Sequence, residues 1–179
     1  MRRYALTAIG AGGPCMAAAV TKVLYGHGCA IGDSNMMLLD NEFTITLIMT
    51  LPKRKGPATV EKDLKKLEKS KDIAVNLKEL PPQRGGQSPP GNLMVTLHGE
   101  NRPGIIYRFS ELLCKLGVDI TNLESKSVAG AKKGLYVVVI EAVLDRHDAL
   151  KKVEGRLKTL ARSLGMKISV MEIEAHNPL

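Results

Sequence analysis

Two stretches decide the fold, Ile9-Gly10-Ala11-Gly12-Gly13-Pro14 and His98-Gly99-Glu100-Asn101-Arg102-Pro103. Gly10 and Gly99 are 89 positions apart, and so are Pro14 and Pro103. The same interval separates three further pairs, which are Gly28 and Gly117, Ile31 and Ile120, and Asp33 and Asn122. A repeat this long indicates two copies of one domain rather than a solenoid of short units. Because the matched residues are typical of turns and helix ends, the copies are expected to share one fold.

The length of the chain agrees with two small domains. It has 179 residues, and a domain of roughly 80–90 residues can fold without disulfides or metals. The stretch from Pro81 to Gly91 is rich in proline and glycine, which is typical of a linker. We therefore expect a first domain at 1–80, a linker at 81–92, a second domain at 93–174 and a tail at 175–179.

Composition excludes several classes of protein. No stretch approaches the ~20 apolar residues of a membrane span, and no secretory signal is recognisable at Met1-Arg2-Arg3. The three cysteines, Cys15, Cys29 and Cys114, suit neither a disulfide framework nor a zinc site. The net charge of +8 is spread over both halves, which favours a solvated surface over a nucleic-acid face. A cytoplasmic protein without membrane contact is expected.

Hydrophobic periodicity predicts the same order of elements in both copies. In the first copy the order is a strand at 4–9, a helix from Pro14 to Gly28, strands at 30–39 and 42–51 joined by Asp40-Asn41, a helix from about Thr59 and a strand at 74–80. In the second copy it is a strand at 93–98, a helix from Ile105 to Gly117, strands at 119–128 and 135–144 joined by a loop at 130–134, a helix from Leu150 to Gly165 and a strand at 167–173.

The order β-α-β-β-α-β predicts the α+β class, with two ferredoxin-like domains. Each predicted helix has a single apolar face, so both helices should cover one side of an antiparallel four-stranded sheet. The strand at 135–144 is the most apolar of the chain and should be central. The other side of each sheet must be covered or wet, and we expect the chain to form a homo-oligomer.

The motifs resemble those of the ACT domain, a small-ligand sensor found in many proteins of amino-acid metabolism. The resemblance rests on Gly99-Glu100-Asn101-Arg102-Pro103-Gly104-Ile105-Ile106 and on Leu116-Gly117-Val118-Asp119-Ile120-Thr121-Asn122-Leu123, with a weaker counterpart in the first copy. Two ACT domains without a catalytic domain resemble the glycine cleavage system transcriptional repressor group. That resemblance implies an amino-acid ligand and a regulatory partner, such as a transcription factor of glycine metabolism, without direct binding to nucleic acid.

The resemblance also implies a ligand site at the first strand–helix turn and the start of the second strand, often between two ACT domains. In the second copy the ligand-binding candidates are Gly99, Asn101, Pro103, Gly104 and Asn122. In the first copy they are Gly12, Gly13 and Asp33. The N-terminus of a helix attracts a carboxylate, and an amide side chain both donates and accepts hydrogen bonds. Because the first copy lacks polar side chains at its turn, its site is expected to be degenerate.

Several of these residues have structural explanations that need no ligand. Gly99, Pro103 and Gly104 are turn-forming residues, and Asn101 is as well suited to capping the helix as to contacting a ligand. Cys15, at the position of Gly104, is expected to be a small buried residue. Met36 and Met37 are expected to fill gaps in a core.

The sequence gives no reason to expect an enzyme, a metal or a cofactor. The four histidines are scattered, and neither a phosphate-binding loop nor a metal-ligand pattern occurs. Within the regulatory interpretation, the alternative is an enzyme-associated sensor subunit. An RNA-recognition module is a further alternative because it has the same element order. The strand at 93–98 has no aromatic residue and the strand at 135–144 only Tyr136, which argues against base stacking.

Overall fold

The computed structural model describes residues 2–13, 15–52, 56–82, 91–128, 135–145 and 149–173. The chain divides into two compact units, Met1–Gly86 and Gln87–Leu179. Most of the expected linker, the tail at 175–179, the loop at 130–134 and the expected helix start at Pro14 lie outside the described residues. The two units are therefore described one at a time.

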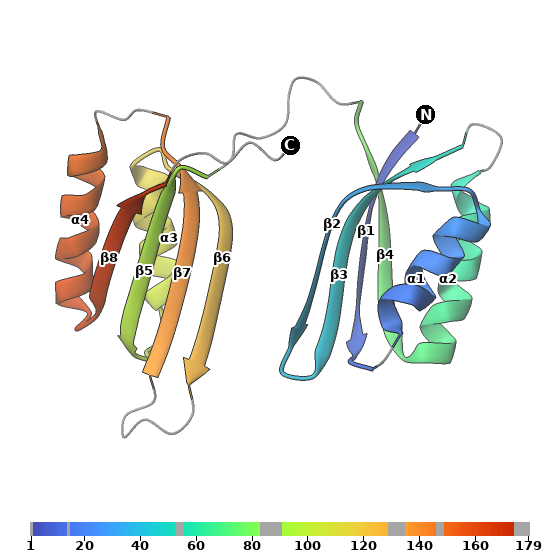
Figure 1. Cartoon of the computed structure of the whole chain (residues 1–179), viewed down its shortest axis with the longest axis horizontal. Helices are drawn as coiled ribbons and strands as arrows, with labels where there is room; N and C mark the ends of the chain where they lie inside the picture. Colours follow the sequence, from blue (N-terminus) through green and yellow to red (C-terminus); the bar gives the residue numbers. More distant parts are fainter. Residues whose placement is uncertain are drawn as a thin grey trace. The chain divides into compact units, whose positions relative to one another are not determined.

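The first unit is an antiparallel four-stranded sheet with two helices on one face (Figure 1). Its elements are β1 (Arg2–Ala11), α1 (Met16–Gly26), β2 (Ala30–Leu39), β3 (Glu42–Leu51), α2 (Pro57–Lys71) and β4 (Ile73–Leu80). The strand order is β2-β3-β1-β4. Asp40 and Asn41 join β2 to β3 with φ angles of 46° and 73°, as a tight hairpin turn with left-handed backbone requires.

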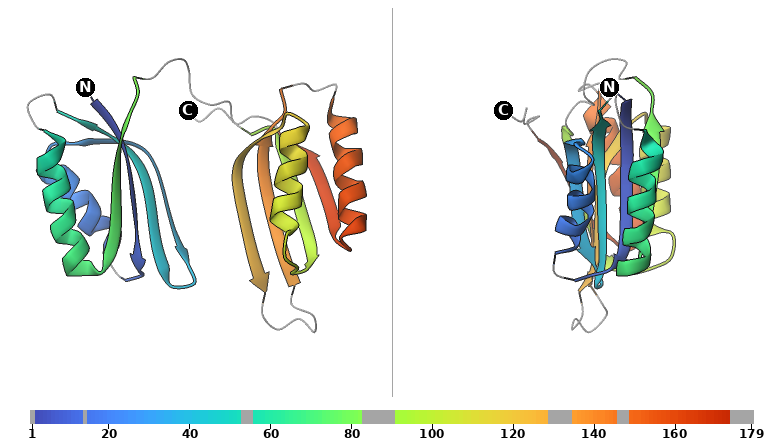
Figure 2. Two further views of the ribbon diagram at one scale, coloured as in Figure 1. Left: turned by 180° about the vertical axis from the view of Figure 1, so that it is seen from behind. Right: turned by 90° about the vertical axis from the view of Figure 1, so that its right-hand side faces the viewer.

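The second unit repeats this architecture, and Figure 2 shows its two helices on one side of the sheet. Its elements are β5 (Leu93–Glu100), α3 (Ile105–Lys115), β6 (Asp119–Val128), β7 (Leu135–Val143), α4 (Leu150–Ser163) and β8 (Lys167–Glu172). The strand order is β6-β7-β5-β8. The predicted fold class is thus confirmed in both units, and the most apolar strand, β7, is central as predicted.

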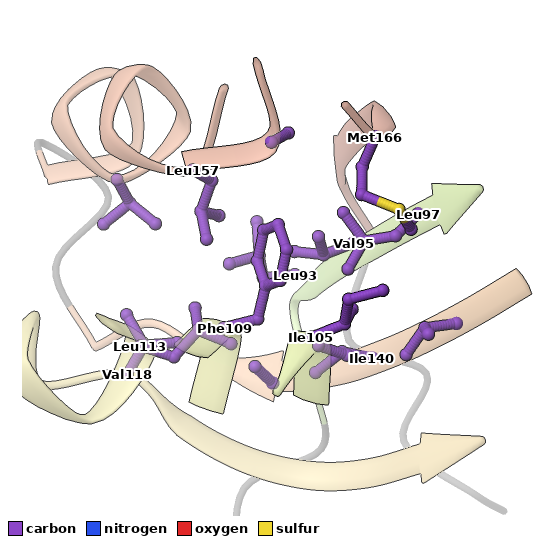
Figure 3. Packing of buried hydrophobic residues seen from close by; sticks show 14 of the residues in the cluster. Leu93, Val95, Leu97, Ile105, Phe109, Leu113, Val118, Ile140, Leu157 and Met166 are labelled. Carbon is purple, nitrogen blue, oxygen red and sulfur yellow. The ribbon is translucent and has the colours of Figure 1, made fainter. Parts of the chain in front are cut away.

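The core of each unit lies between the sheet and its helices. In the second unit, Figure 3 shows Ile105 and Phe109 of α3, Leu157 of α4 and Val95 and Leu97 of β5 in one cluster. All five of these side chains are almost completely buried. Burying a large aliphatic or aromatic side chain contributes about 1.5–3 kcal/mol. The alternating buried positions of β5 and the 3.6-residue spacing in the helices therefore hold the sheet against its helices.

The repeated glycines terminate helices. Gly28 and Gly117 follow α1 and α3 and have the same φ angle, 69°. Gly165 follows α4 with a φ angle of 66°. This left-handed conformation closes a helix and is easiest for glycine. The repeated pair Gly28 and Gly117 thus allows the same change of chain direction from α1 into β2 and from α3 into β6.

Candidate functional site

The β5–α3 turn has an unusual helix start. The residue that caps α3 is Gly104, whose backbone is left-handed with φ 88° and ψ 0° and which provides no side-chain hydrogen bond to the helix. Of the two roles considered for Asn101, helix capping is therefore excluded. The Asn101 amide Nδ2 instead donates to the Ser127 hydroxyl at the end of β6, at 3.4 Å. Asn101 is exposed, so its side chain is accessible to a ligand.

A charged pair lies beside Asn101. Arg102 donates through both Nε and Nη2 to the same carboxylate oxygen of Glu100, at 3.2 and 2.7 Å. Both side chains are more than half exposed, so the pair adds little to stability. The pairing brings a cation and its counter-charge together at the turn.

The three turn residues Gly99, Pro103 and Gly104 have different surroundings. A Cβ atom on Gly99 would lie 2.5 Å from the Met166 sulfur, so Gly99 serves the packing of β5 against the start of β8. A Cβ on Gly104 would meet nothing within 4 Å, and only its positive φ restricts this position to glycine. Pro103 is exposed. Of the two glycines, Gly104 therefore has open space beside it and Gly99 does not.

The equivalent turn of the first unit is closed by the neighbouring hairpin. The Gly12 amide donates to the Asn41 carbonyl at 2.6 Å. A Cβ on Gly12 would overlap that oxygen and lie 2.6 Å from a methyl group of Leu38. Gly13 faces open space. Backbone packing thus explains Gly12, and this turn offers a ligand no polar side chain.

Cys15 departs from its prediction. It is exposed and caps α1 in the left-handed conformation with a φ angle of 69°, so the expectation of a buried residue is wrong. Its backbone repeats that of Gly104, which confirms the alignment of the two turns. The Cβ of a cysteine makes this conformation costly by roughly 1–2 kcal/mol.

Asn122 lies far from the turn of its own unit. Glu100, next to Asn101, pairs with Leu135 on β7, whereas Asn122 pairs with Glu141 on the same strand. Six residues along a strand span about 20 Å. The two predicted asparagines, Asn101 and Asn122, are consequently at opposite ends of the second sheet, and no single unit brings them together.

Asp33 is placed in the same way in the first unit. The turn follows Ala11, which pairs with Glu42, whereas Ser34, next to Asp33, pairs with Leu47. The two β3 partners, Glu42 and Leu47, are about 17 Å apart along that strand. The pairing register shifts between Ile31 and Ser34, and likewise between Ile120 and Asn122. Such irregularities redirect side chains at binding sites.

Carboxylates surround Asn122, a feature that the sequence prediction missed. The Asn122 amide donates to Glu124 at 3.4 Å, and Glu141 is its partner on β7. This end of the sheet suits an ammonium group, whereas the helix start at Gly104 suits a carboxylate. Because side chains alternate between the two faces of a strand, the sequences of β6 and β7 indicate which residues share a face. Only the strand pairing shows that Glu141 is beside Asn122.

Exposed apolar side chains on β2 were also missed. Met36, Leu38 and Leu39 are each more than half exposed, and Met37 is 37% exposed. The expectation that Met36 and Met37 fill a core is therefore wrong. Because β2 is an edge strand, side chains on either face of it lie beyond the cover of the helices.

Two searches of the described residues gave negative results. In the ranges that the structure describes, His, Cys, Asp and Glu side chains nowhere form a group of three or more that could hold a metal ion. Within the same ranges, every helix is too short or too polar to cross a lipid bilayer.

Comparison with known proteins agrees with this fold. Residues 4–78 match the ACT domain family. A solved structure of a protein provisionally named a glycine cleavage system transcriptional repressor is 20% identical, with a TM-score of 0.72 over 97% of this chain and 98% of that one. An unknown protein from Galdieria sulphuraria is 15% identical, with a TM-score of 0.76 over 97% of this chain and 99% of that one. No curated protein matches the chain.

At these identities the two solved structures show a shared fold across both units, and the family match assigns the first unit. ACT domains are regulatory modules that bind small molecules such as amino acids. The second unit has the same strand order, the same helix placement and the same left-handed helix start. Residues 4–78 therefore carry the ACT domain match, and the second unit that follows them has the same fold.

Proposed function

We propose that the chain is a non-catalytic regulatory protein that senses an amino acid through its second unit and thereby modulates a partner protein. The observation that carries the proposal is the open β5–α3 turn, where the exposed Asn101 lies near the left-handed helix start at Gly104. Such a helix start attracts a carboxylate. Asn122, with Glu124 and Glu141 beside it, provides the complementary surface for an ammonium group.

An amino acid is too small to span the about 20 Å between these two surfaces in one unit. A site that uses both must therefore combine the turn of one chain with the β6 start of another. This argument supports a homo-oligomer in which Asn101 and Asn122 of different chains face one ligand. The first unit, whose turn is closed by Gly12 and the hairpin, serves packing or partner contact in this proposal.

The partner is proposed to be a transcription factor of glycine metabolism, bound in the cytoplasm without direct contact to nucleic acid. The name of the similar repressor protein supports this choice. The burial of Tyr4, Phe43 and Tyr136 supports it too, because these aromatic side chains lie in the cores under the helices and leave the sheet faces without a stacking platform. Ligand binding would act by favouring one of two assemblies.

A thermal-shift screen of the full chain against the twenty amino acids tests the proposal. A ligand that binds the native state raises the melting temperature, by an amount that corresponds to about 2.7 kcal/mol at a hundredfold excess over Kd. We expect one amino acid or a small group, such as glycine or serine, to do so. Asn101→Ala and Asn122→Ala should each abolish the shift.

The matched control is Asn76→Ala, which removes an exposed asparagine from β4 of the first unit. It should leave the ligand-induced shift unchanged. The absence of any shift in the wild-type chain at millimolar concentrations would contradict the amino-acid proposal. If the ligand raises the melting temperature of both site variants as much as that of the wild-type chain, the ligand binds elsewhere.

A further inference from the structure

A groove runs between the two helices of the second unit. It has a volume of about 530 Å³. The α3 residues that line it are Tyr107, Arg108, Glu111, Leu112 and Lys115, and the α4 residues are Arg156, Thr159, Leu160 and Ser163. Residues spaced in this way share one face of each helix. The buried faces of the same helices, with Phe109 and Leu157, point to the sheet, so the groove is on the outer surface.

The groove carries more positive than negative charge. Glu111, its one carboxylate, accepts from Lys115 at 3.0 Å and from the Tyr107 hydroxyl at 3.0 Å. These two contacts hold the pKa of Glu111 below its usual range, so it stays ionised and its charge is matched by Lys115. Arg108 and Arg156 have no carboxylate partner among the described residues. Two guanidinium groups, each with several N–H donors, therefore line the groove.

The floor of the groove is apolar. Leu112 and Leu160 are only partly buried and pack against the edge of the core. A ligand that covers them removes apolar surface from water, which stabilises its binding by roughly 25 cal/mol per Å². The groove thus combines an apolar strip with two cations beside it.

The first unit closes the corresponding seam. There, His27 after α1 and Asp63 of α2 are hydrogen-bonded at 2.9 Å between Nε2 and Oδ2. No hydrogen bond or ion pair of the described residues joins α3 to α4. Among the described residues, a side-chain hydrogen bond therefore bridges the two helical segments of the first unit, whereas none bridges α3 and α4.

We propose that this groove is the docking site for an acidic, amphipathic segment of the regulated protein partner. The proposal rests on the regulatory function above and adds the chemistry of the partner. Carboxylates of the segment would pair with Arg108 and Arg156, and its apolar residues would cover Leu112 and Leu160. Helix-in-groove binding is a common mode of peptide recognition.

Two other occupants match the groove less well. A second copy of this chain, with its net charge of +8 and its lysine-rich α2, would bring like charge to the arginines. A nucleic-acid backbone presents phosphates and sugars but no apolar side chains that would cover Leu112 and Leu160. A segment that combines separate carboxylates with apolar side chains matches both the arginines and the leucines.

Fluorescence anisotropy with the full chain tests the proposal. The probe is a labelled synthetic helix with leucines on one face and glutamates flanking them, and the comparison probes are its lysine counterpart, a version with serine in place of leucine and a single-stranded DNA oligonucleotide. We expect the glutamate probe to bind the chain and each comparison probe to bind it more weakly. Arg108→Glu with Arg156→Glu should weaken the glutamate probe about tenfold or more.

The matched control is Lys62→Glu with Lys69→Glu, which reverses two exposed charges on α2 of the first unit. It should change the affinity little. An equal loss in both double variants, or no binding of the glutamate probe to the wild-type chain, would overturn the proposal. So would DNA binding that only the arginine variant loses. The arginine variant should keep the amino-acid thermal shift, so the groove and the sensor can fail separately.

Discussion

Residue scale. The left-handed helix start is the feature that the two units share most closely at the level of single residues. Gly104 and Cys15 occupy equivalent positions, with φ angles of 88° and 69°. Glycine adopts this conformation without steric cost, whereas a Cβ atom raises its free energy by roughly 1–2 kcal/mol. The first unit therefore carries strain that the second avoids.

We predict opposite effects of substitution at these two positions. Gly104→Ala should destabilise the second unit by about 1 kcal/mol, and Cys15→Gly should stabilise the first by a similar amount. Urea unfolding followed by circular dichroism measures both. Gly13→Ala is the control, since its added methyl group meets nothing within 4 Å and its φ is not positive. A destabilising effect of Cys15→Gly would show that the cysteine side chain has a stabilising role that outweighs the strain.

The sequence was least informative about individual polar residues at the turn. Asn commonly caps helices, so residue type alone leaves capping and ligand contact as equal alternatives for Asn101. The actual cap follows from the backbone of Gly104, which starts the helix three residues later. The hydrogen-bond partner of a side chain depends on such backbone angles. The sequence gives only the preference of each residue type for particular angles.

Element scale. The helices and strands themselves could be predicted closely, because their periods and end signals agree. The hairpin at Asp40 and Asn41 and the strands on either side of it have the predicted bounds. The exposure of Met36 and Leu38 was not predictable in the same way. Whether a strand lies at the edge or the centre of its sheet depends on strand pairing, and the local sequence pattern of β2 does not reveal that pairing.

The contact between α1 and α2 leads to a pH prediction. Hydrogen bonds from Lys66, and then from His27, lower the pKa of the Asp63 carboxyl in the folded chain. Because the pKa of Asp63 is lowered in the folded state, the stability that its carboxylate contributes is fully present above the pKa of an ordinary aspartate, about 4. It is lost as the pH falls through the lower folded value. The wild-type chain should therefore lose stability in acid more steeply than Asp63→Asn.

Urea unfolding at a series of pH values between neutral and acid measures this difference. The control is Glu61→Gln on the same helix, which leaves the contact between His27 and Asp63 intact and should keep the steep acid dependence. Parallel curves for the wild-type chain and Asp63→Asn would show that the hydrogen bonds of Asp63 with Lys66 and His27 contribute nothing to pH-dependent stability.

Whole-molecule scale. The repeat interval predicted two units of one fold, and the structure has them. The candidate site could be predicted only in pieces. The residues at the turn and at the β6 start are identifiable in the sequence, but their separation depends on the register of β5 and β6 on β7. The proposal that two chains form one site therefore depends on the strand pairing, which the sequence does not reveal.

The central claim is that Asn101 and Asn122 serve one ligand from different chains, and mixing two inactive variants tests it most directly. Asn101→Ala and Asn122→Ala chains are unfolded together, refolded and titrated by calorimetry with the amino acid found in the screen. Each variant alone should fail to bind. A mixed two-fold dimer regains one intact site, so random pairing should restore about a quarter of the wild-type sites. No recovery in mixtures shown to contain mixed dimers would contradict the shared site.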